Sequence, residues 1–440
     1  MTGTQTFQIR PAEPDDVLAI ARLWDEAFPG THTIEQRVRM METGGRYGGI
    51  ETVRVVTEPD HGIVGAAKLY RMTGHIAGTP MPMMGLAAVA VTPSRRRRGL
   101  AARLCTRAVR AAAERGDVIS VLYPFRPDYY ERLGWGLVGA LQEYRFHTGA
   151  LDIEHAGAAA RVRAADLEHD ADAIAACYAR VAARSNGPIE RDRRVWAYRL
   201  TGLDLGVVPV DAEAIWTARA DPEIRPVVYD DDGAITGYAL LRYVRKGSPE
   251  EHTLEVRELI AGDEAAYRGL LAHIGGQADR WPRCTHYARP DERFGDFLTD
   301  PRPPGFRDAR SLYFPTARIV RGPMLRVLDV PGSLRARRFF DAGGDEPATI
   351  ELAVQDPQRP ANAGPWTVRL EHGGAEVEAG EPSSPDAVLE TDAATFGRIF
   401  AGEIPATVAA AQRRALVDGD AAVLDRAFAT RQRFWLLDEF

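Results

Sequence analysis

The stretch "GLAAVAVTPSRRRRGLAARLCTRAVRAAAERG", residues 85–116, decides the fold expected of this chain. Its first part, Gly85–Val91, combines small and β-branched apolar residues, which is typical of a buried strand. From Gly99 onward, apolar residues recur about once per helical turn among good helix formers, and Gly116 stands where a helix would stop. The four arginines between these segments, Arg95–Arg98, therefore lie in a strand-to-helix turn.

This turn has the features of an anion site. A helix N-terminus leaves its first amides unpaired and carries about half a positive charge. Arg96, Arg97 and Arg98 add fixed charge, while Gly99 and Ala101 keep the approach free of bulky side chains. A pyrophosphate would fit there, although an arginine run can also be a solvated face or a nucleic-acid patch.

The spacing Arg96-x-x-Gly99-x-Ala101 resembles the R/Q-x-x-G-x-G/A pyrophosphate loop of the GNAT superfamily of acetyl-CoA-dependent N-acetyltransferases. The resemblance implies that acetyl-CoA is the co-substrate. It also implies that the strand before the loop pairs with the pantetheine arm. The cofactor-binding residues expected on this basis are Val89, Ala90, Val91, Arg96, Arg97, Arg98, Gly99, Leu100, Ala101 and Ala102.

Length and composition limit the classes of protein to consider. A chain of 440 residues is too long for one ordinary core, so we expect two to four domains. Its net charge of −7 argues against a protein whose main partner is nucleic acid. Its 3 cysteines are widely spaced, which predicts neither a disulfide framework nor a metal site. With no signal-like start and no long apolar run, we expect a cytoplasmic protein without a membrane anchor.

Three segments follow one another along the chain. Residues 1–150 predict a mixed α/β domain of strands, a crossover helix and the arginine loop. Within residues 151–314, the stretch His252–Gly276 repeats the strand-turn-helix rhythm, but Asp263 and Glu264 replace the arginines. We interpret this as a second copy without a cofactor site, with chance similarity as the alternative. Residues 315–440 predict strands, a hairpin and helices. Two Pro-rich segments, 289–306 and 355–366, are expected to be surface insertions.

This order of parts resembles the Eis (enhanced intracellular survival) family of acetyltransferases, and "VAVTPSRRRRGLAA", "YYERLGWG" and the terminal "EF" are the motifs that carry the resemblance. The resemblance implies an α/β (α+β) fold with two tandem GNAT-like domains, followed by a sterol-carrier-protein-like domain. It also implies a homohexamer built as a trimer of dimers.

The family pattern Y-x-R-F/L-G-F/Y/W-G falls on Tyr130–Gly136, and its tyrosine is the general acid. Tyr130 would then protonate the coenzyme A thiolate, as a neutral phenol within hydrogen-bond reach can do. An aromatic packing role is the alternative, and Tyr129 is the neighbour most easily confused with it. The "YPFRPD" segment departs from the small residues usual in the family, and cofactor contacts are expected there at Phe125 and Arg126.

The family also uses the carboxylate of its last residue as the general base, which implies that role for Phe440. A free α-carboxylate has a pKa of roughly 3.5, so desolvation or a relaying water is needed. Docking of the apolar end for stability alone is the alternative. Glu439, Asp25 and Glu26 would make the acceptor site acidic, which favours polycationic amines.

Aminoglycosides are the acceptors that the family implies, with polyamines or protein lysines as alternatives. We expect direct transfer in a ternary complex, without a metal. A lipid-binding carrier is the alternative from another class.

Overall fold

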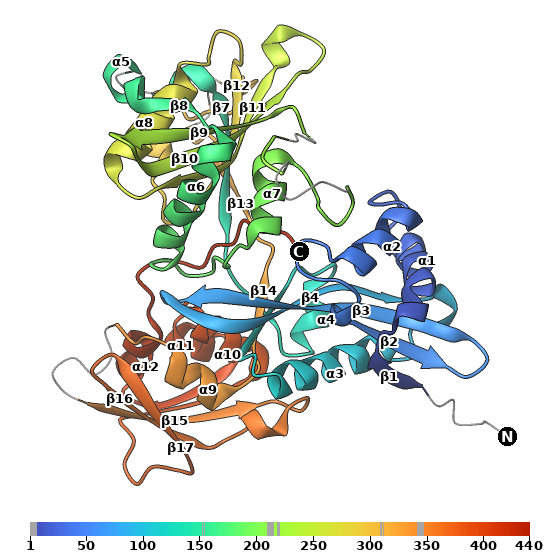
Figure 1. Cartoon of the computed structure of the whole chain (residues 1–440). Coiled ribbons are helices and arrows are strands. Elements are labelled where there is room, and N and C mark those ends of the chain that lie inside the picture. Colours follow the sequence, from blue (N-terminus) through green and yellow to red (C-terminus); the bar gives the residue numbers. More distant parts are fainter. Residues whose placement is uncertain are drawn as a thin grey trace. The chain divides into compact units, whose positions relative to one another are not determined.

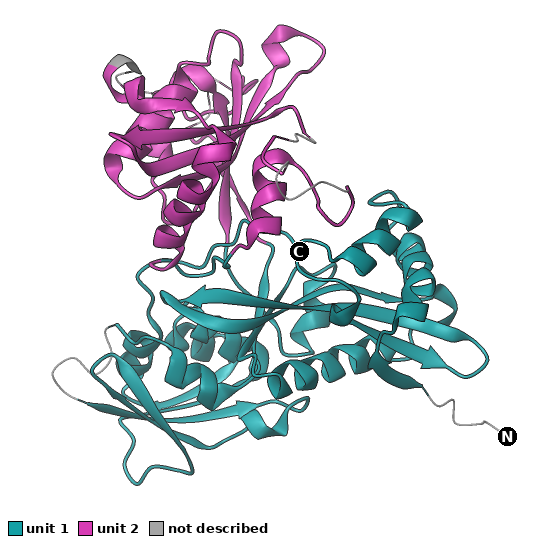
Figure 2. Cartoon of the chain, in the orientation of Figure 1, with its two compact units in different colours: residues 1–139, 185–190, 322–440 teal, residues 140–184, 191–321 magenta. Residues whose placement is uncertain are grey.

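The computed structural model describes residues 7–440 except 152, 154, 209–214, 218–220, 309, 311 and 341–346. The chain divides into two compact units, which Figure 2 shows in different colours. Unit 1 contains residues 1–139, 185–190 and 322–440, and unit 2 contains residues 140–184 and 191–321. The predicted domain boundaries near residues 150 and 314 stay a prediction.

The first sheet of unit 1 has the strand order β1-β2-β3-β4-β5-β14-β6 (Figure 1). Its strands are β1 (Gln8–Pro11), β2 (Val53–Glu58), β3 (Gly62–Ile76), β4 (Thr79–Val91), β5 (Ile119–Leu122), β14 (Met324–Val327) and β6 (Gly136–Leu137). The helices that accompany it are α1 (Val17–Ala27), α2 (Ile34–Thr43), α3 (Leu100–Glu114) and α4 (Pro127–Glu131). The predicted strand, arginine turn and helix are confirmed as β4, the loop after it and α3.

Helices cover both faces of this sheet. The stripe of α1 that contains Ile20 and Trp24 packs on Val53 and Val55 of β2. Alternate strand residues point the other way, where Leu104 of α3 and its neighbours pack. This two-sided burial explains why the strands of the arginine motif are almost continuously apolar.

The sheet of unit 2 repeats this order strand for strand, as β8-β9-β10-β11-β12-β7-β13. Its strands are β8 (Val162–Ala164), β9 (Ile224–Asp231), β10 (Ala234–Val244), β11 (Thr253–Ala261), β12 (Arg283–Ala288), β7 (Leu141–His147) and β13 (Ala317–Val320). Its helices are α5 (His155–Ala158), α6 (Leu167–Ala182), α7 (Arg193–Thr201) and α8 (Glu264–Gly275).

The two copies exchange one strand. β7 follows the first copy in sequence but lies in the sheet of unit 2, beside β12. β14 follows the second copy and lies in the sheet of unit 1, between β5 and β6. Sequence segmentation could not reveal this exchange, because the pattern within a strand does not specify which sheet it joins.

The predicted loss of the arginine loop in the second copy is confirmed in the local geometry. Asp263 caps α8, and its side chain accepts a hydrogen bond from the Ala266 amide at 2.8 Å. A carboxylate at this helix N-terminus occupies the position that a phosphate would need.

The C-terminal part of unit 1 is an α+β arrangement with the strand order β17-β16-β15-β18-β19. Its strands are β15 (Ala348–Gln355), β16 (Trp366–Glu371), β17 (Gly374–Ala379), β18 (Ala387–Asp392) and β19 (Ala415–Gly419). Its helices are α9 (Val330–Ala336), α10 (Ala393–Phe400), α11 (Ala406–Ala411) and α12 (Ala421–Phe428). The predicted hairpin lies between β16 and β17, and α10 packs against β14 and β6 of the first sheet.

The two Pro-rich segments lie mostly at the surface, as expected, but each also contributes a side chain to the interior. Phe294 in the first segment is 1% exposed and packs on Tyr144 and Phe146. In the second, Asp356 binds Arg326 in an ion pair whose side chains are both fully buried. Each segment thus contributes to a core. Among the described residues, no helix is long and apolar enough to cross a membrane.

Candidate active site

The site is built where β4 and β5 diverge. These parallel strands pair only from Met83–Gly85 to Ile119–Val121. Past this point β4 has a bulge, in which Ala88 and Val89 together oppose Ala67 of β3 and the φ of Ala88 is 50°. The Trp24 indole fixes the bulge by donating to the Ala88 carbonyl at 2.8 Å.

The bulge leaves the edge of β4 beyond Gly85 without pairing to β5. Of the predicted cofactor residues on it, Val89 and Val91 are half-buried and Ala90 is 5% exposed. Backbone groups on such an edge can pair with an extended ligand arm as a neighbouring strand would.

The arginine loop presents three of its four arginines to solvent. Arg96, Arg97 and Arg98 are exposed, whereas Arg95 turns back and binds the buried Glu58, with 2.5 Å between Nε and Oε2. The backbone is left-handed at Arg97 (φ 62°), a conformation that is uncommon for a non-glycine residue and often marks a functional site.

The helix that follows the loop is open at its start. Gly99 is the N-cap of α3 in a left-handed conformation, and no side chain caps the helix. The first amides therefore stay available for an anion. Leu100 is 2% exposed and packs in the core, so it can offer only its backbone, while Ala101 and Ala102 are half-buried.

Tyr130 lies on α4 in an aromatic cluster and is 4% exposed. Its ring meets those of Tyr129, Phe125 and Trp135, with centroid distances of 5.1, 5.6 and 6.2 Å. Burial raises the pKa of Tyr130 well above its usual value, so the phenol stays protonated at neutral pH. Tyr129 differs in that its hydroxyl is buried without a hydrogen-bond partner, and burial raises its pKa to about 12.

The glycines of "YYERLGWG" make room for the C-terminal part of unit 1. A Cβ on Gly134, whose φ is 89°, would lie 1.5 Å from Nη1 of Arg326, which donates to the Leu133 carbonyl. A Cβ on Gly136 would lie 2.1 Å from the Ala394 carbonyl oxygen of α10. The turn after Tyr130 is thus shaped by residues nearly two hundred positions later in sequence.

The C-terminal tail, residues 429–440, docks on the first sheet as predicted from its apolar sequence. Phe434, Trp435 and Leu436 are 1%, 2% and 5% exposed. The Tyr123 hydroxyl donates to the Asp438 carbonyl at 2.7 Å, immediately before the end. This places the last residue at the divergence of the strands.

The Phe440 ring lies against Gly85, where an added Cβ would come 3.1 Å from its Cε2 atom. Three tyrosines surround the ring, with centroid distances of 5.5 Å to Tyr123, 6.0 Å to Tyr47 and 6.4 Å to Tyr70. Phe440 contacts Tyr123 and Tyr130 contacts Phe125, so the two predicted catalytic residues flank one short segment after β5. In that segment Phe125 is 70% exposed, and Arg126 binds the exposed Asp128.

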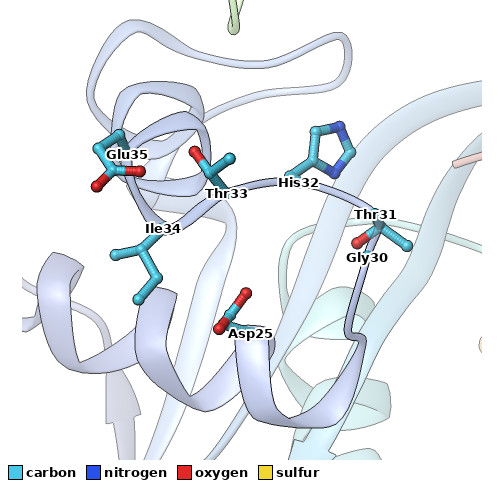
Figure 3. Close-up of a pocket in the computed structure, with 7 residues that line it drawn as sticks. All are labelled: Asp25, Gly30, Thr31, His32, Thr33, Ile34 and Glu35. Carbon is cyan, nitrogen blue, oxygen red and sulfur yellow. The ribbon is translucent and has the colours of Figure 1, made fainter.

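A hollow of about 440 Å³ opens beside α1 and the start of α2 (Figure 3). Its lining residues are Asp25, Gly30, Thr31, His32, Thr33, Ile34 and Glu35. Two carboxylates give it an acidic lining, and Arg37 shapes it by donating to the Phe28 carbonyl and the Thr31 hydroxyl. The other two predicted acceptor residues, Glu26 and Glu439, are exposed and do not line this hollow.

Unit 2 has the same divergence of strands but fills it. Its parallel pair β11–β12 also ends at a bulge, between Val256 and Glu258. Glu258 is 1% exposed and binds Arg191 at 2.7 Å, together with Arg199 and the Tyr238 hydroxyl. Burial alone would raise the pKa of Glu258, but Arg191 and Arg199 outweigh it and hold the pKa at about 2.

The two copies also share a second similarity in sequence, which was not among the predictions. The segment "RPDYYERLG", residues 126–134, has the counterpart "RPDERFG", residues 289–295, which differs by Leu to Phe and by the absence of the two tyrosines. Glu292, the counterpart of Glu131, is buried against His286 and Tyr267. The second copy therefore lacks the residue that would donate a proton. No group of three or more metal-ligating side chains occurs in the described part of either unit.

Comparison with known proteins agrees with this geometry. Two acetyltransferase (GNAT) domains match residues 8–138 and 187–327, and a sterol carrier protein domain matches residues 330–437. N-acetyltransferase Eis of Mycobacterium tuberculosis is 26% identical over 394 residues, 87% of each chain. An uncharacterized N-acetyltransferase of Streptomyces avermitilis is 26% identical, with 83% of this chain and 82% of that protein covered.

Two solved structures share the whole fold. A GCN5-related N-acetyltransferase from Anabaena variabilis superimposes with a TM-score of 0.79 at 18% identity, over 99% of this chain and 100% of the other. Eis1 from Mycobacterium abscessus superimposes with a TM-score of 0.73 at 20% identity, with the same coverage. The fold of this chain is thus shared over its whole length with these two proteins.

Proposed function

Because the chain is an N-acetyltransferase of the Eis type, with two GNAT domains followed by a sterol-carrier-protein-like domain, we propose that it transfers acetyl groups from acetyl-CoA to amino groups of polycationic small molecules such as aminoglycosides. The observation that carries this proposal is that the buried Tyr130 and the docked Phe440 contact one short segment after β5, at Phe125 and Tyr123 respectively.

Acetyl-CoA fits the groups that unit 1 offers. Its pyrophosphate would lie on the amides at the start of α3, with Arg96, Arg97 and Arg98 around it. Its pantetheine arm would pair with the open edge of β4 at Val89–Val91. Phe125 is free on its exposed side to cover that arm.

The chemistry needs a proton taken from an ammonium and a proton given to a thiolate. Tyr130 supplies the second, because burial keeps its phenol protonated across the neutral range. The Phe440 carboxylate takes the first, directly or through one water, and the tyrosines around the Phe440 ring hold this last residue in place. Transfer is then direct, in a ternary complex that holds amine and thioester together.

The acceptor class follows from the charges beside α1. Asp25 and Glu35 line a hollow large enough for a sugar-sized polycation. Aminoglycosides suit this combination better than a single lysine side chain. We further propose assembly as a homohexamer.

The experiment is thiol release from acetyl-CoA by the purified protein with aminoglycosides, spermidine and a lysine peptide, beside a control without amine. Saturable release with aminoglycosides above that control supports the proposal. Preference for spermidine or the peptide would instead assign the acceptor to polyamines or protein lysines. No release with any amine, despite acetyl-CoA binding, would refute the proposed acceptor class.

A further inference from the structure

Residues 185–190 form a short strand-like segment of unit 1 that joins the tip of the β3–β4 hairpin. The His75 amide donates to the Pro188 carbonyl at 2.8 Å, and the Gly187 amide donates to the His75 carbonyl at 2.6 Å. Gly74 and Ile189 form an antiparallel bridge. A segment embedded in the second copy by sequence thereby extends the sheet of the first.

Asn186 is the centre of this segment and is 1% exposed. Its Oδ1 accepts from the Ala77 amide at 3.2 Å, at the tip of the hairpin. Its Nδ2 donates to the Ala401 carbonyl at 2.8 Å, just past α10, and to the Gln432 carbonyl at 3.3 Å, in the C-terminal tail. One carboxamide thus joins three parts of unit 1 that are far apart in sequence.

The backbone around Asn186 holds the tail a second time. The Trp435 amide donates to the Asn186 carbonyl at 2.9 Å. Gly187 has a φ of 115°, and a Cβ there would lie 2.1 Å from the Trp435 carbonyl oxygen, so the two backbones are in direct contact. Five residues after Trp435 the chain reaches Phe440.

We propose that Asn186 is a positioning residue for acetyl transfer, because it fixes the C-terminal tail to the hairpin and thereby sets where the Phe440 carboxylate lies. This inference rests on the proposed role of Phe440. Tyr123 holds the tail at Asp438, and Asn186 anchors it near residues 432–435 through a side chain that also binds the hairpin. A displacement of about 1 Å at a reacting group can cost a hundredfold in rate.

The test combines Asn186→Ala with a chain extended by one glycine after Phe440, in a double-mutant cycle on the full-length protein. We expect Asn186→Ala to lower kcat by about 10- to 100-fold without changing the affinity for acetyl-CoA, since Asn186 binds the hairpin tip, Ala401 and the tail, whereas acetyl-CoA is proposed to bind at the arginine loop and the edge of β4. In the extended chain, Asn186→Ala should change kcat less than twofold. Hydrogen exchange of residues 430–440 reports tail docking independently of activity, and should accelerate in Asn186→Ala.

Two further variants make the result interpretable. Asn362→Ala removes the other buried asparagine, which binds Asp356 and the start of α9, and should lower stability while leaving tail exchange unchanged. Asn186→Ser keeps a small polar group at this position. If Asn186→Ala folds poorly, the Asn186→Ser protein should retain more activity than the Asn186→Ala protein.

The outcomes separate the two proposals. Suppose that the glycine extension abolishes turnover. If Asn186→Ala then leaves either the hydrogen exchange of the tail or kcat unchanged, the role of Asn186 is overturned and Phe440 remains the proposed base. A fully active extended chain overturns the role of Phe440 and the positioning function built on it. Additive losses in the double variant also overturn the inference, because Asn186 would then act by another route.

Discussion

Gly134 offers a sharp test of how the C-terminal part of unit 1 shapes the catalytic turn. Its φ is 89°, and an added Cβ would lie 1.5 Å from Nη1 of the buried Arg326 and 3.1 Å from the Cβ of Ala393. In Gly134→Ala, either Arg326 or the turn must move. The Trp135 amide donates to the Tyr130 carbonyl at 3.1 Å, so a shifted turn also displaces Tyr130.

The magnitude can be separated into two contributions by a matched control. Gly116 has a similar φ of 94° but nothing within 4 Å of its added Cβ. Gly116→Ala therefore costs only the left-handed backbone, about 1 kcal/mol of unfolding free energy. Gly134→Ala adds overpacking of about 1–3 kcal/mol, which brings its total to about 2–4 kcal/mol. Because the turn carries Tyr130, the proposed general acid, we also expect a roughly tenfold loss of kcat.

Urea unfolding of the two variants measures the first effect, and initial rates of thiol release at saturating substrates measure the second. Gly116→Ala should keep the parental kcat. The reasoning is refuted if Gly134→Ala is no less stable than Gly116→Ala and equally active, since Arg326 would then not occupy the space that the glycine leaves.

Three other predictions concern the remaining parts of the site. Tyr130→Phe should keep acetyl-CoA affinity while lowering kcat by about two to four decades, and unchanged turnover in a stopped assay would remove Tyr130 as the acid. Arg97→Ala combined with Arg98→Ala should weaken acetyl-CoA binding measured by calorimetry, and the loss should be larger at low salt than at high salt. An affinity equal to that of the parent would mean that these arginines are simply solvent-exposed and do not bind the cofactor. Glu258→Gln should cost about 3–5 kcal/mol by removing the carboxylate charge that compensates the buried Arg191 and Arg199. Since the pKa of Glu258 is lowered to about 2, its stabilisation is present above about pH 4.5 and is lost as the pH falls toward 2, which acid unfolding of the parent and the variant would compare.

The sequence alone could predict the local parts of the site. The strand, arginine turn and helix at residues 85–116 depend on periodicity and on glycine, which act over a few residues, and the structure has them as expected. The burial of Phe434–Leu436 followed from the cost of exposing an apolar end. Asp263 as a helix cap followed from the same local chemistry.

Features that depend on distant segments could not be predicted. Arg95 belongs to the same run as Arg96–Arg98, yet it pairs with Glu58, which only the sheet register brings near. The exchange of β7 and β14 leaves no mark on either strand. Glu26 lies next to Asp25 in sequence but faces away, because successive helix residues point about 100° apart. The absence of the two tyrosines from "RPDERFG" was visible in the sequence. It can be recognised as a difference between two copies only once the matching strand order is known.

The most direct test of the account is the single glycine appended after Phe440. It moves the terminal carboxylate by about 3.5 Å while leaving every side chain of the protein in place. We predict that the extended protein binds acetyl-CoA with parental affinity, unfolds at the parental urea concentration and loses at least 90% of its kcat with an aminoglycoside, by analogy with other losses of a general base of about 10²-fold or more. An extended protein as active as the parent would contradict the account, because the carboxylate would then have no part in proton transfer.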